Sequence, residues 1–411
     1  MNPITGGQMR IAMLSVHSCP VGRLGTKDTG GMSVYVLELA RELGKSGHLV
    51  DIYTRVHDSE DRQIYELGRN VRLMHLKAGK GGEIHKLAVY AHLPEFTREL
   101  ENFRQRTQFR YDLVYSHYWL SGLVGRQLCQ WWDVPHLIMF HTLGVVKNTI
   151  GIGEIEPELR IETERELVKD CQRIIAATEK EKSDLIGHYG ASPEAVHVIP
   201  CGVNLELFRP VDRKEVRRQL GFDGDGKNIL YVGRIEPLKG LDKLLKAMTY
   251  LKNKPGIRLL VIGGDENNQC EINRLKQLSR ELQIQGLVFF LGLIKQSELP
   301  FYYGAADVCV VPSYYESFGL VAMEALACGT PVVTTKVGYA ENIIRQGRDG
   351  YVMMDNTPST LSEKIARLLS RSNGDAKSVN ARRATVTRFS WSKIAVRLAR
   401  ECETLRASHL R

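Results

Sequence analysis

Short apolar runs alternate with helical patterns along almost the whole chain. Such runs, where Val and Ile are frequent, are typical of strands that are buried on both faces of a parallel sheet. Strands are expected at residues 10–16, 49–55, 111–116, 135–140, 173–178, 195–200, 228–232, 258–262, 288–291, 307–311 and 332–335. The alternation of strands and helices predicts an α/β fold built on parallel sheets.

The length of 411 residues suits two domains. Residues 201–210 have the pattern of a linker, and a new series of strands begins at residue 228. We therefore expect a first domain at 1–205 and a second at 206–389. Two similar halves joined by one crossing imply a cleft between them.

The composition is that of an ordinary globular protein, with 43% hydrophobic and 25% charged residues. No apolar run approaches the roughly 18 residues that a membrane span needs. The first residues lack the basic and apolar regions of a signal peptide. The eight cysteines are scattered, without a C-x-x-C pair or zinc spacing. We expect a reduced, cytoplasmic protein that needs no metal and no cofactor.

The formal charge of +9 is concentrated near the end of the sequence. Residues 367–411 contain eleven Lys or Arg and three Asp or Glu, a net charge of +8. Such a tail forms either a solvated helical face or a weak contact with an anionic membrane. No nucleic-acid-reading module accompanies it, so nucleic acid is not an expected partner. A homodimer is left open.

Two glutamates flank the start of a predicted helix in the second half. Glu316 lies in the turn before the helix, which spans 320–328, and Glu324 lies within it. Gly319 permits a close approach of the backbone to a ligand, and the first amides of the helix would face an anion. Two carboxylates for hydroxyl groups, with a positive helix end between them, suit a sugar nucleotide. A solvated pair of glutamates beside a buried helix is the competing interpretation.

A second anion site is predicted where the strand at 228–232 ends. Arg234 and Lys239 follow this strand and precede the next helix. Arginine can bind phosphate with two parallel hydrogen bonds, and lysine supplies a mobile point charge. The chain contains neither G-x-x-x-x-G-K-[ST] nor G-x-G-x-x-G, which disfavours P-loop enzymes and dinucleotide-binding dehydrogenases. Together with the helix start at Leu320, this pair is a candidate diphosphate clamp.

Histidines end two predicted strands of the first half. His117 follows 111–116 and His141 follows 135–140. Ligands of open α/β sheets gather at the carboxyl ends of strands. Two histidines at this edge fit a ligand site and a structural role equally well.

The sequence around these residues resembles the retaining glycosyltransferases of family GT4. The likeness extends over nearly the whole chain, and its most specific parts are the E-x7-E motif at 316–324, within 312–333, and the phosphate-binding loop at 233–240. The resemblance implies a GT-B fold, in which two Rossmann-like domains face a cleft. It also implies that the final helix, at about 390–411, crosses back to the first domain.

The same resemblance implies transfer from a UDP-sugar with retention at the anomeric carbon. The leaving diphosphate would accept the acceptor's proton, and no metal is required. The catalytic residues implied are His141, Arg234, Lys239 and Glu316. The donor-binding residues implied are Gly31, Arg234, Lys239, Glu316, Phe318, Gly319, Leu320, Val321 and Glu324.

The first half is similar to the inositol phosphate N-acetylglucosaminyltransferases of mycothiol synthesis, through residues 15–20, 30–35, 116–122 and 141–148. This similarity implies a small phosphorylated acceptor such as inositol phosphate. The acceptor-binding residues implied are Ser33, Lys86, Tyr118, Thr142 and Arg160. His117 and Trp119 would shape the acceptor wall, and Lys147 and Asn148 would orient donor or acceptor. Ser33 stands where that group has an Asn that contacts the inositol ring, so the phosphate site is kept while the ring identity is not.

Several alternatives stay open. Sucrose-phosphate synthases share residues 29–31 and 160–162, which indicates transfer of glucose to a sugar phosphate. The basic tail fits a membrane phospholipid as acceptor. A UDP-sugar epimerase or hydrolase, and a sugar-nucleotide sensor without catalysis, are compatible with the same fold.

Overall fold

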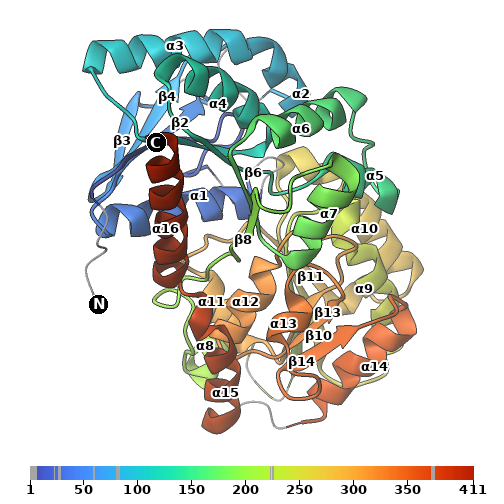
Figure 1. The fold of residues 1–411 in the computed structure, drawn as a ribbon. Helices are drawn as coiled ribbons and strands as arrows, with labels where there is room; N and C mark the ends of the chain where they lie inside the picture. The colour runs from blue at the N-terminus through green and yellow to red at the C-terminus, as the bar shows by residue number, and fades with distance from the viewer. Residues whose placement is uncertain are drawn as a thin grey trace.

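The structure is a computed structural model of the chain, and it describes residues 7–22, 24–25, 29–58, 61–79, 84–222, 224, 226–371 and 375–411. Figure 1 shows two α/β halves, each with helices on both faces of a central sheet. This arrangement confirms the predicted fold class of two Rossmann-like domains.

The first half contains a sheet of eight strands in the order β3-β4-β2-β1-β5-β6-β7-β8. All its pairings are parallel except that of β3 with β4. The strands are β1 (Arg10–Leu14), β2 (Leu49–Arg55), β3 (Ile64–Gly68), β4 (Val71–Leu76), β5 (Leu113–His117), β6 (His136–Met139), β7 (Arg173–Ala176) and β8 (Val196–Val198). The helices are α1 (Gly31–Lys45), α2 (Lys86–Val89), η1 (Tyr90–His92), α3 (Leu93–Thr107), α4 (Tyr118–Trp132), α5 (Gly144–Ile150), α6 (Glu158–Asp170) and α7 (Glu179–Tyr189).

The second half contains a parallel sheet of six strands in the order β11-β10-β9-β12-β13-β14. The strands are β9 (Lys227–Val232), β10 (Ile257–Ile262), β11 (Val288–Gly292), β12 (Val308–Val311), β13 (Val332–Thr335) and β14 (Gly350–Met353). The helices are α8 (Arg213–Gln219), η2 (Pro237–Lys239), α9 (Leu241–Met248), η3 (Glu266–Asn268), α10 (Gln269–Glu281), η4 (Gln285–Leu287), α11 (Leu299–Ala305), α12 (Leu320–Ala327), α13 (Ala340–Ile343), α14 (Pro358–Leu369), α15 (Ala376–Val386), η5 (Thr387–Phe389) and α16 (Trp391–His409).

The last helix, α16, packs on the first half, as the family resemblance implied (Figure 1). Its buried residues recur at helical spacing, from Trp391 through Leu398 to Leu405. The Trp391 ring meets the ring of Tyr35 from α1 edge to face, with centroids 5.4 Å apart. At its far end, Arg406 forms an ion pair with Asp112 at 3.2 Å. One hydrophobic core therefore continues from the second half through α16 into the first.

Three strands were not predicted from the sequence. In β4 the apolar residues are interrupted by Arg72 and His75, and β3 is a largely exposed edge strand. The third, β14, has only four residues and follows a glycine-containing turn. The glycine-rich segment at 79–82 lies largely outside the described residues.

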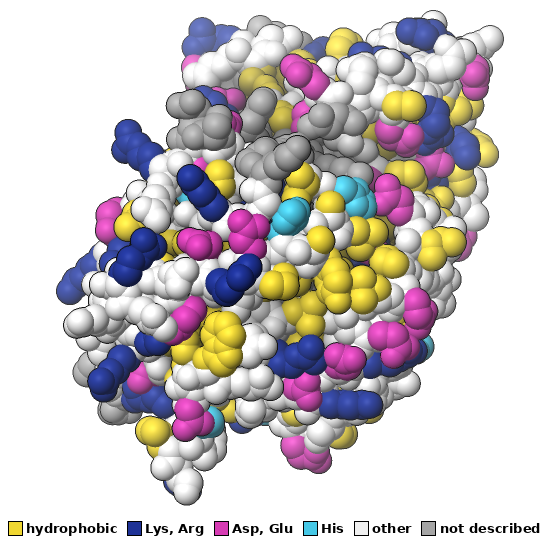
Figure 2. All heavy atoms as spheres, turned by 90° about the horizontal axis from the view of Figure 1, so that it is seen from above, with side chains coloured by type: hydrophobic (Ala, Val, Ile, Leu, Met, Phe, Trp, Pro, Cys, Tyr) yellow, Lys and Arg dark blue, Asp and Glu magenta, His cyan; other side chains and the backbone are white. Residues whose placement is uncertain are grey.

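The basic residues of the tail lie in α14, α15, η5 and α16 and in the segments that follow α14 and α16. Several are engaged within the fold, and Arg383 donates to the carbonyl oxygens of Leu205 and Phe208 in the connecting segment. On the face seen from above, basic and acidic side chains are interspersed (Figure 2). None of the helices in the described ranges is both long and apolar enough to cross a membrane. A membrane-surface contact and a homodimer both stay predictions.

Candidate active site

The carboxyl ends of the central strands of the two sheets bear loops that touch across the two halves. A methyl group added at Gly30 would lie 3.7 Å from Nε of Arg234, and one at Gly31 would lie 3.6 Å from a methyl carbon of Leu320. The start of α1 therefore abuts both the loop after β9 and the start of α12. These contacts bring the predicted anion clamp next to the first half.

Lys239 and Glu316 form an ion pair. The Lys239 Nζ donates to Glu316 Oε1 at 2.7 Å, and the Ser313 hydroxyl donates to the same oxygen at 2.8 Å. Both charged side chains are more than four-fifths buried. The two residues were expected to bind different parts of the donor, and the structure brings them into direct contact. Their roles toward a ligand stay predictions.

The start of α12 has the geometry of an anion site. Gly319 precedes the helix with φ of 96°, a left-handed conformation that glycine adopts readily. The amides of Leu320 and Val321 belong to the first turn, where N–H groups lack partners within the helix. Phe318 is buried and stacks on Tyr339, with ring centroids 5.3 Å apart. Phe318 thus holds the turn in place.

Glu324 is a buried carboxyl whose protonation is finely balanced. Burial raises its pKa to about 7, while a hydrogen bond from the Tyr303 hydroxyl, at 2.8 Å to Oε2, opposes the shift. Near neutral pH the group therefore exists in both forms. A ligand hydroxyl that donates to Glu324 would favour the ionised form.

Arg234 forms an ion pair with Glu236 at 2.9 Å. Burial raises the pKa of Glu236. The positive charges of Arg234 and Lys239 lower this pKa by more than burial raises it, so the net shift is downward. Lys147 and Lys86 of the first half also lower this pKa. The cations of the two halves therefore act on one carboxylate, which indicates that the predicted donor and acceptor sites are close neighbours.

His117 and His141 form a buried pair. Nδ1 of His117 and Nε2 of His141 lie 2.9 Å apart. Burial lowers the pKa of His141 to about 3 and that of His117 well below its usual value, so both rings are neutral. His141 adopts a left-handed conformation with φ of 61°, and Tyr118 likewise has φ of 75°. Such strain in residues other than glycine is concentrated at functional sites.

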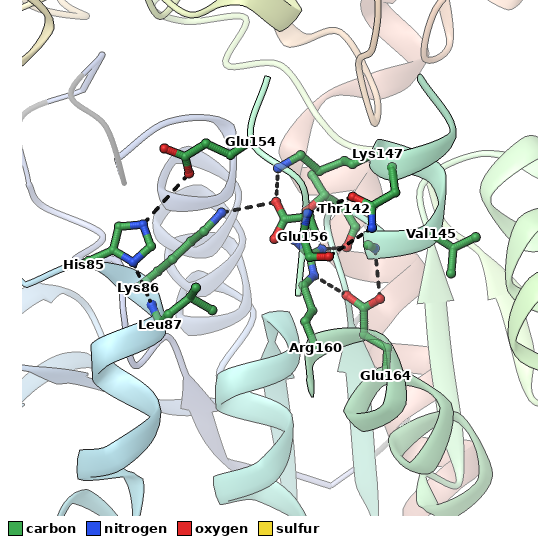
Figure 3. A network of polar contacts seen from close by, with 12 residues as sticks. His85, Lys86, Leu87, Thr142, Val145, Lys147, Glu154, Glu156, Arg160 and Glu164 are labelled. Carbon is green, nitrogen blue, oxygen red and sulfur yellow. Dashed lines mark hydrogen bonds and ion pairs between the residues drawn. The ribbon is translucent and has the colours of Figure 1, made fainter. Parts of the chain in front are cut away.

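Figure 3 shows a dense polar network beside these strand ends. At its centre Arg160, from α6, is fully buried. Its Nη2 donates to the Thr142 carbonyl at 2.7 Å and to the Thr142 hydroxyl at 3.0 Å. Its Nε donates to Glu164 at 2.7 Å, and its guanidinium lies 4.8 Å from the centre of the Tyr118 ring. Three of the predicted acceptor residues are thereby in contact.

The carboxylate of Glu156 contacts Arg160 and the two lysines of the predicted site. Oε1 accepts from Lys86 at 3.2 Å and from Lys147, while Oε2 pairs with Arg160 at 2.9 Å. Burial raises the pKa of Glu156, but Arg160 and the two lysines outweigh it and bring the pKa to about 2. Asn148 binds the Glu156 backbone with both its amide atoms.

Two predicted acceptor-side residues lie slightly apart from this network. The Ser33 side chain is fully buried, and its hydroxyl lies 2.7 Å from that of Ser18. Trp119 is fully buried and stacks on Tyr90. Neither is among the charged residues around Glu156.

Sequence reasoning missed three residues of the site: His17, Glu156 and Tyr303. The ring of His17 lies 4.4 Å from that of Tyr118, and its buried Nδ1 has no hydrogen-bond partner among the described residues. Buried polar atoms normally have partners, so His17 Nδ1 is a candidate hydrogen-bonding group for a ligand. His17 follows a predicted strand, as His117 and His141 do, and that position was the available signal. Within the described ranges, no cluster of His, Cys, Asp or Glu could hold a metal ion.

Comparison with known proteins agrees with this architecture. Residues 29–207 match the family described as Glycosyltransferase Family 4, and residues 212–385 match Glycosyl transferases group 1. The chain belongs to the family 4 glycosyltransferases and is a glycosyltransferase of the GT-B fold. The resemblance inferred from the motifs is thereby confirmed.

The chain is similar to several glycosyltransferases in sequence and to several solved structures in fold. A D-inositol 3-phosphate glycosyltransferase from Geodermatophilus obscurus is 40% identical over 93% of this chain and 87% of that protein. One from Catenulispora acidiphila is 38% identical over 98% and 97%. Among solved structures, the sucrose-phosphate synthase of Thermosynechococcus elongatus has a TM-score of 0.89 and 33% identity, covering 98% of this chain and 100% of that one. HepE of Anabaena, solved with UDP and glucose, shares the fold at a TM-score of 0.77 and 19% identity over 97% and 100%.

Proposed function

We propose that this glycosyltransferase moves a hexosyl or N-acetylhexosaminyl group from a UDP-sugar to a small phosphorylated polyol or sugar, with retention at the anomeric carbon. The observation that carries the acceptor part is the convergence of Lys86, Lys147 and Arg160 on one buried carboxylate. Three cations at a strand-end edge suit a phosphomonoester, because charge-assisted hydrogen bonds are strong. The relatives named for D-inositol 3-phosphate favour an inositol phosphate.

The donor would bind across the second half. Arg234, Lys239 and the first amides of α12 would contact its diphosphate. Glu324 would accept from the ribose hydroxyls, and Glu316 from those of the sugar. The HepE complex with UDP-glucose, a protein of the same fold, supports a nucleotide-sugar donor.

Catalysis would then consist of positioning and charge stabilisation. The acceptor hydroxyl attacks the anomeric carbon, the bond to the diphosphate breaks, and the leaving diphosphate takes the hydroxyl proton on the same face. Preorganised donors aimed at the diphosphate stabilise the charge that develops there. The neutral His141 would offer a hydrogen bond to the donor sugar without adding charge.

A second candidate is transfer of glucose to a sugar phosphate, which the likeness to sucrose-phosphate synthase favours. Both candidates are tested by UDP release from UDP-glucose and UDP-N-acetylglucosamine, with inositol phosphate, fructose 6-phosphate and glycerate phosphates as acceptors. The proposal expects release that depends on one phosphorylated acceptor. Fast release without any acceptor would indicate a hydrolase instead.

A further inference from the structure

The two carboxylates beside Arg160 are held in different ways. Glu164 Oε2 accepts from the Gly144 amide at 2.9 Å and from the Tyr189 hydroxyl at 2.5 Å, while Oε1 accepts from Arg160. Its side chain is fully buried among these partners. Glu164 is therefore a fixed part of the fold.

Glu156, in contrast, is surrounded by the charged ends of three long side chains. Within the described ranges, the partners of its carboxylate are Lys86 from α2, Lys147 from α5 and Arg160 from α6 (Figure 3). The two lysine side chains are 18% and 17% exposed, so the cluster is open to solvent on their side. An anion that arrives from solvent meets the lysines first and then the carboxylate.

The charge balance selects which anion can enter. Three cations and two carboxylates, Glu156 and Glu164, leave a net charge of +1. With Glu156 withdrawn, the net charge is +2, which a phosphomonoester dianion neutralises. A ligand carboxylate carries one negative charge, the same charge that Glu156 already supplies, so it would leave the net charge of the cluster at +1.

The backbone of Glu156 is held independently of its carboxylate. Asn148 Nδ2 donates to the Glu156 carbonyl at 2.9 Å, and the Glu156 amide donates to Asn148 Oδ1 at 2.7 Å. These two bonds hold the Glu156 backbone without using its carboxylate. On Arg160, Nε and Nη2 bind Glu164 and Thr142, and the pair with Glu156 uses the remaining nitrogen, Nη1. That nitrogen can change partner while the other two hold the guanidinium.

We propose that Glu156 determines the charge specificity of the acceptor site: its carboxylate occupies the anion position between Lys86, Lys147 and Arg160, and a phosphomonoester enters by displacing it. The inference rests on the acceptor part of the proposed function. An acceptor with one negative charge, or none, does not displace Glu156, so the residue excludes unphosphorylated polyols and sugar acids.

The test is calorimetric binding of inorganic phosphate and of acetate, at pH 8, to the full chain. The wild type should bind phosphate and not acetate. Glu156→Gln should bind phosphate about tenfold more tightly, because a competing buried charge is removed, and should also bind acetate. Glu158→Gln removes an exposed carboxylate two residues away and should change phosphate affinity less than about twofold.

Glu156→Asp serves if the glutamine variant does not fold. It keeps the charge but shortens the side chain by one methylene, and it should bind phosphate with intermediate affinity. Unchanged or weaker phosphate binding in either Glu156 variant would overturn the inference, because Glu156 would then be positioning the cations rather than competing with the ligand.

Turnover separates the two proposals. If phosphate binding follows Glu156 as expected while no phosphorylated acceptor supports UDP release, the proposed function fails, and only the displacement of Glu156 by a phosphate anion stands. If UDP release depends on a phosphorylated acceptor while the Glu156 variants bind phosphate no more tightly than the wild type, only the inference fails.

Discussion

The two facing sides of this enzyme handle charge differently. In the second half, Lys239 pairs with a single carboxylate, Glu316, and both side chains are more than four-fifths buried. In the first half, three cations converge on Glu156, and Arg160 is fully buried. The first arrangement resembles a clamp whose parts can separate around a ligand. In the second, one carboxylate of the chain lies between three cations that come from three different helices.

Replacing Arg160 should cause the largest loss in the free energy of unfolding. Arg160→Ala leaves Glu156 and Glu164 buried with a lost partner, and breaking a buried pair in this way destabilises by ~3–5 kcal/mol. Urea unfolding measures the loss. In folded material, the acceptor KM should rise far more than the donor KM.

Arg165→Ala is the matched control, since Arg165 lies on the same helix, α6, and is 40% exposed. Its free energy of unfolding should change by less than about 1 kcal/mol. Equal losses in the two variants would remove the distinction between a built-in site and a surface ion pair.

Lys239→Ala should lower the rate next most strongly. By analogy with removing one preorganised donor, it should lose ~3 kcal/mol of transition-state stabilisation, or on the order of 100-fold in kcat. Steady-state kinetics measure the change, and Lys246→Ala, at a half-exposed position on α9, should stay close to the wild type. Near wild-type turnover in Lys239→Ala would refute the clamp.

The donor side should also depend on pH through Glu324. Because burial raises its pKa to about 7, the carboxyl is mostly protonated at pH 6 and mostly ionised at pH 8. Ribose hydroxyls donate to the ionised form, so UDP-glucose affinity should rise about tenfold over this interval. Tyr303→Phe removes a hydrogen bond that lowers this pKa and should move the rise to higher pH. A flat pH profile in the wild type would argue against contact between Glu324 and the donor.

An effect of similar, modest size is expected on the free energy of unfolding at Gly319. Gly319→Ala has open space for the added methyl group, but its φ of 96° disfavours other residues by ~1–2 kcal/mol. Gly187→Ala, within α7 and also with open space, should instead stabilise the chain by about 0.5–1 kcal/mol. Thermal unfolding compares them. The same sign in both variants would show that backbone strain at Gly319 is not significant.

The same contrast explains what sequence reasoning could find. The predicted donor motif is continuous in sequence, from Glu316 to Glu324. Most strands are recognisable in the sequence as apolar runs. Glu156 could not be found this way. The three cations that surround it belong to α2, α5 and α6, and only the fold brings these helices together and buries the carboxylate. Tyr303 was missed for a similar reason, since its hydroxyl meets Glu324 from another helix. The antiparallel edge strand β3 was not predicted, because its residues are largely exposed and do not form an apolar run.

On the proposed function, the first half selects a phosphorylated acceptor through its cations. The most direct measurement is the ratio of kcat/KM for a phosphorylated acceptor to that for the same polyol without phosphate, in the wild type and in Lys86→Met Lys147→Met. We expect a ratio of at least about 100 in the wild type, because charge-assisted contacts are each worth ~1.5–3 kcal/mol, and a fall toward one in the double variant. An equal ratio in both proteins would contradict it.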